Sequence, residues 1–320
     1  MDIDSTDTIH SLWWTAGSVD EEAGIYYNTS TDGGKSFSPR HLISRTLPQR
    51  VLHAQLTIDK SDTVWATWEE VEEYVERCNM VIIPVGAIEQ HGPHLPVSTD
   101  TSIMEGMLDT VIPLVPDALD LRILPIQQVG KSNEHLYAPG TLTIPATTLI
   151  DHWVEIGHSV ARAGIRKIII ITSHGGNEEV MGIVSRELRV RARMMSVKTS
   201  WMRFGLPEDM YSEQERRYGI HGGDVETSLM RHFRPELVDM SKAENFVSAV
   251  KRAEGEFDLL KHTGTHAFAW MANDLHPSGT VGEAAEATAE KGRATAEHQA
   301  KGFVELAKEL RRADLDDWLA

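Results

Sequence analysis

Side chains that bind metals and carry protons follow the most apolar stretch of this sequence. "MVIIPVGAI", residues 80–88, reads as a buried strand and leads directly into Glu89 and His91, and Asp100 lies at the expected start of a helix. In an extended segment, residues two apart point to the same side. Reacting groups in open α/β sheets lie just beyond the carboxyl ends of the strands. Glu89, His91 and Asp100 are therefore candidate ligands of a metal ion.

Two more segments end in the same way. The apolar run "RKIIIITS" releases His174 into "HGGN", and "HGGDVETS" brings His221, Asp224 and Glu226 to the start of an expected helix. Three strand or helix ends thus offer histidine together with carboxylate, which suits a metal site. The single cysteine, Cys78, excludes an internal disulfide framework and a cysteine-based zinc knuckle.

Several of these residues have a second interpretation. Asp100 could be a helix N-cap, and the glycines after His174 could form an anion-binding nest at a helix N-terminus. His94, followed by Leu and Pro, is more typical of a structural or supporting residue. His135, in "SNEHLYAPG", could line a substrate pocket or cap a loop.

The elements expected to position these residues are those of an α/β protein. Apolar runs that read as strands alternate with amphipathic stretches at 102–115, 147–163, 178–195 and 283–312. This pattern predicts a mostly parallel sheet covered on both faces by helices. We place a domain boundary near Trp68 and assign residues 68–320 to the α/β domain.

Residues 1–67 read differently, as a β-rich appendage of short alternating runs split by turn residues. "STDGGKSF", residues 30–37, fits the Asp-box turn and resembles one blade of a sialidase-like β-propeller. In that motif Asp32 bonds local backbone amides, and we expect Phe37 to pack under the next strand. One blade is too few for a propeller.

Composition excludes some classes of partner. The formal net charge of −17 and the pI of about 5.3 argue against nucleic acid or an anionic membrane surface. No apolar run approaches the length of a membrane span, and the N-terminus does not read as a signal peptide. We therefore expect a cytoplasmic protein.

Four blocks, "PVGAIEQHGPHLPVSTD", "SNEHLYAPGTL", "TSHGGN" and "HGGDVETS", together resemble the creatininase family of metal-dependent amidohydrolases over residues 68–310. The resemblance implies a three-layer α/β/α sandwich, a small-molecule substrate and a dinuclear centre of zinc, manganese or iron. It also implies a homo-oligomer, commonly a hexamer.

Carried over residue by residue, the resemblance gives Glu89, Asp100 and His174 as ligands of one metal, and His91 with a bridging Asp100 as ligands of the second. His221 would handle protons at the substrate. Ser132 and His135, in the second block, are expected to bind substrate.

The sequence also departs from the family pattern. Creatinine-cleaving members carry a glutamate where this chain has Gly176, and Trp-Asp where it has Arg217 and Tyr218. Glu226 is our candidate for the missing carboxylate ligand, with a supporting role as the alternative. Arg217 and Tyr218 become expected substrate-binding residues, although Arg217 could simply face solvent.

The predicted activity is hydrolysis of a C–N bond in a small polar cyclic amide or formamide, larger and more anionic than creatinine, with water activated between two divalent ions. Alternatives within this enzyme class are a deformylase of formamidopyrimidine nucleotides, a keto-inositol hydrolase and a peptide-trimming enzyme. From a different class, the N-terminal segment leaves open a carbohydrate-binding or propeller-derived interaction module.

Overall fold

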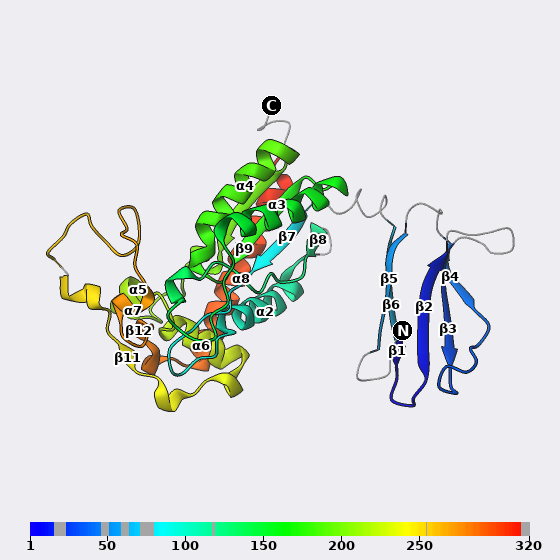
Figure 1. The fold of residues 1–320 in the computed structure, drawn as a ribbon, viewed down its shortest axis with the longest axis horizontal. Helices are drawn as coiled ribbons and strands as arrows, with labels where there is room; N and C mark the ends of the chain where they lie inside the picture. Colours follow the sequence, from blue (N-terminus) through cyan, green and yellow to red (C-terminus); the bar gives the residue numbers. More distant parts are fainter. Residues whose placement is uncertain are drawn as a thin grey trace. The chain divides into compact units, whose positions relative to one another are not determined.

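The chain forms two compact units, Met1–Cys78 and Asn79–Ala320. The computed structural model describes residues 1–15, 24–45, 51–58, 64–70, 80–116, 119–253 and 255–314 (Figure 1). We describe each unit by itself. The domain boundary that we expected after residue 67 precedes this division and stays a prediction. Cys78 lies outside the described residues.

The first unit is built from antiparallel strands. Four of them form a sheet in the order β1-β2-β3-β4, and the other two, β5 and β6, pair as a hairpin. Their bounds are Asp2–Ile3 (β1), Ile9–Thr15 (β2), Gly24–Ser30 (β3), His41–Arg45 (β4), Val51–Ile58 (β5) and Val64–Glu70 (β6). The predicted boundary near Trp68 thus falls inside β6, and residues 71–79 lie outside the described part.

The Asp-box segment forms the turn after β3. Asp32 Oδ1 accepts hydrogen bonds from the backbone amides of Lys35 and Ser36, both at 2.9 Å, and from Ser30 Oγ at 2.8 Å. Asp32 thus holds the turn together, as its sequence pattern indicates. Phe37 is 42% exposed, so our expectation that it packs under the next strand is wrong. The resemblance to a propeller blade stays a prediction.

The second unit contains a four-stranded sheet in the order β10-β9-β7-β8. Every pairing in this sheet is parallel. The strands are Met80–Val85 (β7), Leu121–Ile123 (β8), Lys167–Thr172 (β9) and Met195–Ser200 (β10). In the central pair, Val85 lies opposite Thr172, so β7 and β9 end at the same edge of the sheet.

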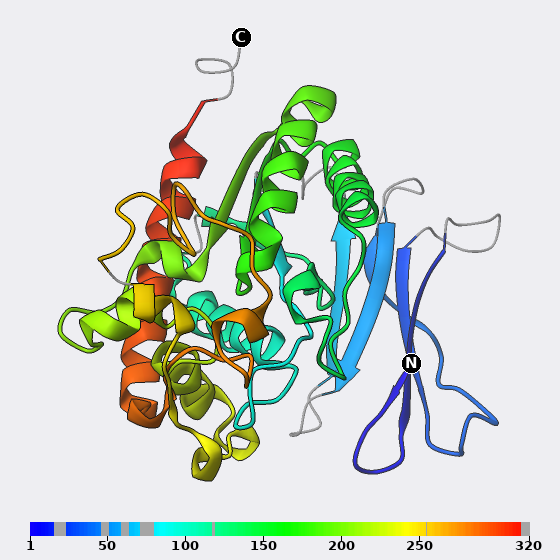
Figure 2. The ribbon, with the colours of Figure 1, turned by 60° about the vertical axis from the view of Figure 1, so that its left-hand side comes forward.

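Helices cover both faces of this sheet (Figures 1 and 2). Helices α3 and α4 lie on one face, and α2, α6 and α8 lie on the other. Their bounds are Thr99–Val111 (α2), Ala146–Arg162 (α3), Glu178–Ala192 (α4), Asp224–Phe233 (α6) and Ala289–Arg312 (α8). This is the three-layer α/β/α sandwich that the sequence predicts.

Alternating residues of the central strands enter two separate layers of packing. Ile82 and Ile169 join one core with Met104 of α2, Leu229 of α6 and Phe303 of α8. Their chain neighbours, such as Ile83 and Ile170, point to the other face and are equally buried. A strand buried on both faces reads as a continuous apolar run, which is why β7 and β9 could be recognised in the sequence.

Shorter elements complete the second unit beyond the sandwich. They are Glu213–Tyr218 (α5), Ala272–Leu275 (α7), Asn245–Phe246 (β11) and Gly282–Glu283 (β12), the last two paired antiparallel. None of the described helices combines the length and apolar character that crossing a membrane requires.

Candidate metal centre

The candidate ligands converge at the carboxyl edge of the sheet. Glu89 and His91 follow β7, and His174 follows β9, its neighbour in the sheet. Asp100 is the second residue of α2, so it is not the N-cap, and the N-cap residue Ser98 makes no side-chain capping bond. Strand register and the entry of α2 therefore bring together residues far apart in the chain.

Three of these side chains form a buried group. His174 Nδ1 lies 3.2 Å from Glu89 Oε1 and 3.7 Å from Asp100 Oδ2. Ligand atoms of the three residues all lie within 4.8 Å of one another, and all three residues are buried. The separations are close enough for one cation to contact all three.

A second group adjoins the first through Asp100. His91 Nε2 lies 3.7 Å from Asp100 Oδ2 and 3.9 Å from Glu226 Oε2. His91, His221 and Glu226 form another set whose ligand atoms lie within 4.8 Å of one another. Asp100 Oδ2 thus lies between His174 and His91, which is where a bridging carboxylate would be needed.

Buried polar atoms without partners mark the same place. Both carboxylate oxygens of Glu89, Nε2 of His91 and Oδ2 of Asp100 are buried and have no hydrogen-bond partner among the described residues. Leaving one such group unsatisfied costs about 1–3 kcal/mol, and more for a charged group. These donor atoms are the oxygen and imidazole ligands that divalent zinc, manganese and iron accept. The residues present therefore fit a metal centre.

Hydrogen bonds on the far side of each imidazole ring orient the ligand nitrogens. His174 Nε2 lies 2.8 Å from the Lys131 carbonyl oxygen, and His91 Nδ1 lies 3.1 Å from that of Glu89. If these nitrogens donate, His174 Nδ1 and His91 Nε2 keep their lone pairs for the centre. Such outer contacts are the usual support of metal-binding histidines.

The electrostatics of the cluster reflect a concentration of buried charge. Burial and the neighbouring Glu89 carboxylate raise the pKa of Asp100 well above its usual value. Burial and the adjacent His221 lower the pKa of His91 well below its usual value. For Glu89, burial raises the pKa, but the nearby imidazoles of His174, His221 and His91 outweigh it and lower the pKa below the ordinary range.

The predicted proton-handling and substrate residues lie at different distances from this cluster. His221 Nδ1 is 3.6 Å from Glu89 Oε1, and His135 Nε2 is 3.3 Å from the same atom. Ser132, three residues before His135, is fully buried, and its hydroxyl has no partner among the described residues. His94 contacts Thr227 Oγ1 at 2.9 Å.

Two residues of the site escaped the sequence reasoning. Glu134 Oε1 lies 3.5 Å from His174 Nε2, on the side of the ring away from the cluster. The side-chain nitrogen of Gln90 donates to the Gly279 carbonyl at 2.7 Å and lies 2.8 Å from His135 Nδ1. Both residues lie inside the quoted blocks: Gln90 stands between Glu89 and His91, and Glu134 stands between Ser132 and His135. Their position next to candidate site residues is the one feature of the sequence that could have indicated a role for them.

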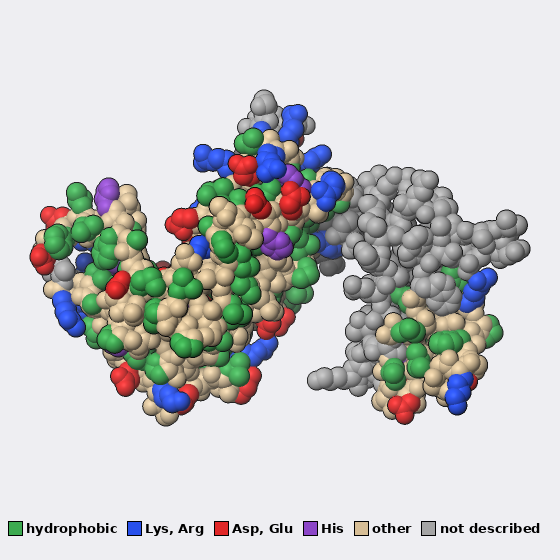
Figure 3. Space-filling view, in the orientation of Figure 1, with side chains coloured by type: hydrophobic (Ala, Val, Ile, Leu, Met, Phe, Trp, Pro, Cys, Tyr) green, Lys and Arg blue, Asp and Glu red, His purple; other side chains and the backbone are tan. Residues whose placement is uncertain are grey.

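A cavity of about 540 Å³ opens onto the cluster. His135, His174, His221 and Glu226 line it. The segment after His262 also contributes to the lining, with Thr263, Gly264, Ala267, Ala269 and Trp270. The segment 255–270 projects from the second unit in Figure 1, and Figure 3, in the same orientation, shows a hollow beside it. The metal centre is therefore open to a ligand.

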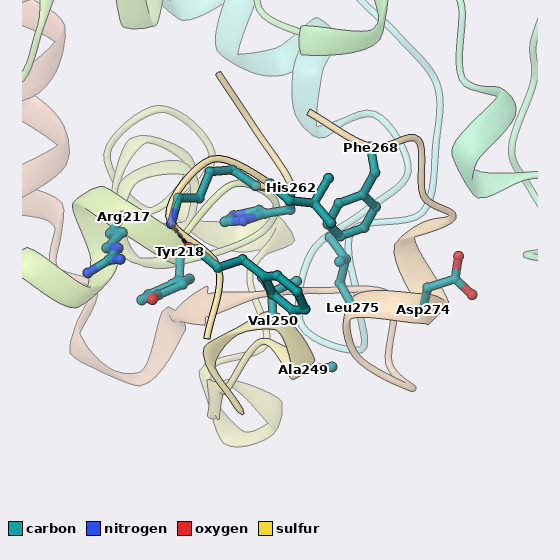
Figure 4. A pocket seen from close by; sticks show the side chains of 11 residues that line it. Arg217, Tyr218, Ala249, Val250, His262, Phe268, Asp274 and Leu275 are labelled. Atoms are coloured by element: carbon teal, nitrogen blue, oxygen red, sulfur yellow. Dashed lines mark hydrogen bonds between the residues drawn. The ribbon is translucent and has the colours of Figure 1, made fainter. Parts of the chain in front are cut away.

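Arg217 and Tyr218 line a different pocket, which we call the His262 pocket (Figure 4). Arg217 is exposed and its guanidinium carbon lies 5.2 Å from the centre of the Tyr218 ring. The structure does not bring these two residues into the cavity at the metal cluster. Their part in substrate binding stays a prediction.

Comparison with known proteins identifies the family. The family model described as creatininase, creatinine amidohydrolase, matches residues 65–307. The chain belongs to the creatininase family. Creatininases are metal-dependent hydrolases that act on C–N bonds, and the donor set described above agrees with that chemistry.

Individual relatives within the creatininase family differ in what they act on. The mycofactocin precursor peptide peptidase of Mycolicibacterium smegmatis is 34% identical over 50% of this chain, and the match spans 60% of that protein. The 3-dehydro-scyllo-inosose hydrolase of Thermotoga maritima is 26% identical over 71% of this chain and 76% of its own length. A creatininase variant solved in a Zn-Zn form has a TM-score of 0.58 at 25% identity, covering 76% of this chain and 96% of that one.

The creatininase centre of this chain has no room for a side chain at Gly176. A Cβ atom there would lie 2.4 Å from His174 Nε2, 2.4 Å from the Lys131 carbonyl oxygen and 2.5 Å from Glu134 Oε1. Gly175 and Gly176 lie in a 3-10 turn, Gly175–Asn177, and neither has the positive φ that an anion nest uses.

Proposed function

We propose that this creatininase-family hydrolase holds two divalent ions, zinc, manganese or iron. Glu89, Asp100 and His174 would hold one, and His91, Asp100 and Glu226 would hold the other. The observation that supports this most strongly is the set of buried, unpartnered atoms on Glu89, His91 and Asp100. Glu226 replaces the missing carboxylate in this proposal, since its Oε2 faces His91 Nε2.

When bound, two such ions lower the pKa of water and polarise a carbonyl group, so that an amide can be hydrolysed near neutral pH. The chain supplies the proton transfers. His221 Nε2 lies 2.7 Å from the Gln90 carbonyl oxygen, to which it can donate, leaving Nδ1 toward Glu89 and the centre. From that position Nδ1 can take a proton and return it to the leaving nitrogen, a role worth about 10²–10⁴ in rate.

His135 supports the same centre from the second block. Burial, followed by the nearby His221, lowers its pKa to about 3, so His135 is neutral at physiological pH. Gln90 donates toward its Nδ1, which leaves Nε2 as a donor directed at Glu89 or at a bound substrate.

The proposed substrate is a small polar cyclic amide or formamide other than creatinine. A specific observation favours a second candidate, a peptide-type amide: the cavity of about 540 Å³ is open and borders another pocket, so it is not confined to one small ring. A formamidopyrimidine-nucleotide deformylase and a keto-inositol hydrolase are further alternatives. An interaction module that binds carbohydrate is the alternative from outside the enzyme class.

The setting of the enzyme is also part of the proposal. We propose a cytoplasmic homo-oligomer, hexameric by resemblance, that acts on a small molecule and has no nucleic-acid or membrane partner. The net charge of −17 supports the exclusion of nucleic acid and of an anionic membrane surface.

Metal analysis of the Asp100→Ala variant tests the two-ion proposal. Loss of both ions is expected, because one carboxylate would contact each of them. Asp109→Ala is the matched control, since Asp109 lies exposed on the same helix, α2, and is absent from the ligand groups. Full metal retention by Asp100→Ala, measured by plasma mass spectrometry, would refute the assignment. Hydrolysis of a panel of cyclic amides, formamides and short peptides would then identify the substrate.

A further inference from the structure

We propose that the His262 pocket is a second binding pocket, which holds a bulky apolar residue of a peptide-type amide while the scissile bond lies at the metal centre. This inference rests on the proposed amidohydrolase function and names the substrate class. It assigns a role to a part of the molecule that the proposed chemistry does not use.

The pocket has the size and the lining of a ligand site. Its volume is about 330 Å³, within the range of small-molecule pockets. Val250, Leu260, Phe268 and Leu275 are among the apolar residues that line it (Figure 4). This apolar part of the lining suits an aromatic or branched apolar side chain better than a sugar.

His262 provides an independent sign of a ligand. It is only 6% exposed, and neither of its ring nitrogens has a hydrogen-bond partner among the described residues. Its ring stacks on Tyr218, with 5.8 Å between ring centres and 11° between planes, and its carbonyl accepts a bond from Trp270 Nε1 at 2.8 Å.

A buried polar ring without a partner is unfavourable, and an occupant can relieve that cost. The backbone N–H or C=O of a bound amide would pair with His262, while the attached side chain fills the apolar space. One residue of a peptide offers both a polar backbone group and an apolar side chain, whereas a purely apolar ligand contacts only the apolar lining and leaves His262 without a partner.

The pocket and the metal cavity share one wall, the segment 260–270. Neighbouring residues of this segment face the two spaces: Leu260, His262 and Phe268 line the His262 pocket, and Thr263, Ala267 and Trp270 line the metal cavity. A substrate that occupies both spaces must therefore be longer than a single small ring. Leu260 and Phe268 are 50% and 39% exposed, and such an occupant would cover apolar surface that now faces solvent.

Binding of N-acetyl-phenylalaninamide tests the pocket directly. Calorimetry with the full chain, freed of metal by a chelator, is expected to show binding at least tenfold tighter than that of N-acetyl-alaninamide. Two adjacent leucines make a matched pair, because Leu260 lines the pocket and Leu259, 71% exposed, does not. Leu260→Ala should weaken binding about fivefold through lost apolar contact, and Leu259→Ala should not change it.

Two further variants separate the two proposed contributions to binding, which are the apolar contact inside the His262 pocket and the hydrogen bond to the His262 ring. Val250→Trp should block the pocket and abolish binding. His262→Phe keeps an aromatic ring against Tyr218 and removes both nitrogens, so binding of the amide should weaken about fivefold while circular dichroism stays unchanged. Equal affinity for the two amides, or equal losses at Leu259 and Leu260, would overturn the proposal.

Hydrolysis by the metal-loaded chain distinguishes failure of the pocket from failure of the proposed function. Acetylated dipeptides that differ only in alanine or phenylalanine should be cleaved with different kcat/KM, the phenylalanine peptide faster. Cleavage at equal rates would refute the pocket and leave amide hydrolysis standing. Binding of the phenylalanine amide without hydrolysis of any amide would refute the proposed function and leave the pocket standing.

Discussion

Glu215 is a buried carboxyl group whose ionisation should be visible in the stability of the second unit. It is 1% exposed and lies on α5. One carboxylate oxygen accepts a bond from the backbone amide of Val225 at 3.2 Å, and the other from that of Glu283 at 2.7 Å. The carboxyl group fits here because three surrounding residues have no side chain: Gly219, Gly223 and Gly282. A Cβ atom on any of them would lie within 2.8 Å of the Glu215 carboxyl group. Glu215 therefore ties α5 to β12 and to the start of α6, which carries Glu226.

The magnitude follows from the pKa of this group. Burial raises the pKa of Glu215 from 4.5 to about 7, with the two backbone amides opposing the rise. At about 1.4 kcal/mol per pKa unit, this corresponds to roughly 3 kcal/mol. Between pH 4.5 and 7 the folded chain binds a proton that the unfolded chain lacks. Stability from this group is therefore fully present below pH 4.5 and is lost as the pH rises to 7.

Glu215→Gln removes the titration, and Glu213→Gln, at an exposed position of the same helix, is the control. We expect the unfolding free energy of wild type relative to Glu215→Gln to fall by roughly 3 kcal/mol from pH 4 to pH 8. Urea unfolding of the metal-free chain is monitored by hydrogen exchange of the backbone amides in β7 and β9. Because both strands belong to the second unit, this measurement gives the unfolding free energy of that unit alone. A difference that stays constant over this range, or an equal trend in Glu213→Gln, would refute the reasoning.

Three other predictions concern the metal centre and its surroundings. Removal of Met1–Cys78 should leave metal content unchanged, because no candidate ligand lies there; a truncated chain that folds but binds no metal would contradict this. His221→Ala should lower kcat at least 100-fold while the metal stays bound. Kinetics and metal analysis on the same sample measure both quantities. Creatinine should be a poor substrate, and efficient creatinine turnover would contradict this prediction. Arg217→Ala should raise KM only for anionic substrates, because a guanidinium group pairs with carboxylate or phosphate.

Strand ends explain why much of the site could be predicted. β7 and β9 are buried on both faces, so their sequences are continuous apolar runs, and the residues after them must meet where the paired strands end. By contrast β10, with the sequence "MSVKTS", is an edge strand with one neighbour and carries no apolar run. Its identity depends on pairing with β9, which the local sequence does not reveal.

Residues whose roles depend on packing between distant segments could not be assigned in this way. Gln90 stands between two candidate ligands and points instead to His135 and to the Gly279 carbonyl. Arg217 and Tyr218 were chosen because they stand where creatinine-cleaving members carry Trp-Asp, shortly before the fourth block, yet the last turn of α5 places them at the His262 pocket. Their place in the sequence put them near the fourth block, whereas the path of α5 decides which space they face.

The balance of charge around the centre supports two ions over one. Glu89, Asp100 and Glu226 face the histidine cluster, and a fourth carboxylate, Glu134, lies on the outer nitrogen of His174. Burial raises the pKa of Asp100 and of Glu226, and the negative charge of Glu89 adds to the rise at both. Divalent cations reverse this effect, because each favours the ionised form of the carboxylates around it. The three carboxylates that face the centre carry more negative charge than one divalent ion can neutralise, so a single ion would leave excess negative charge in a buried site. In the proposed centre, Glu226 would supply the carboxylate that creatinine-cleaving members carry at the position of Gly176, so the charge that the centre can hold would be the same.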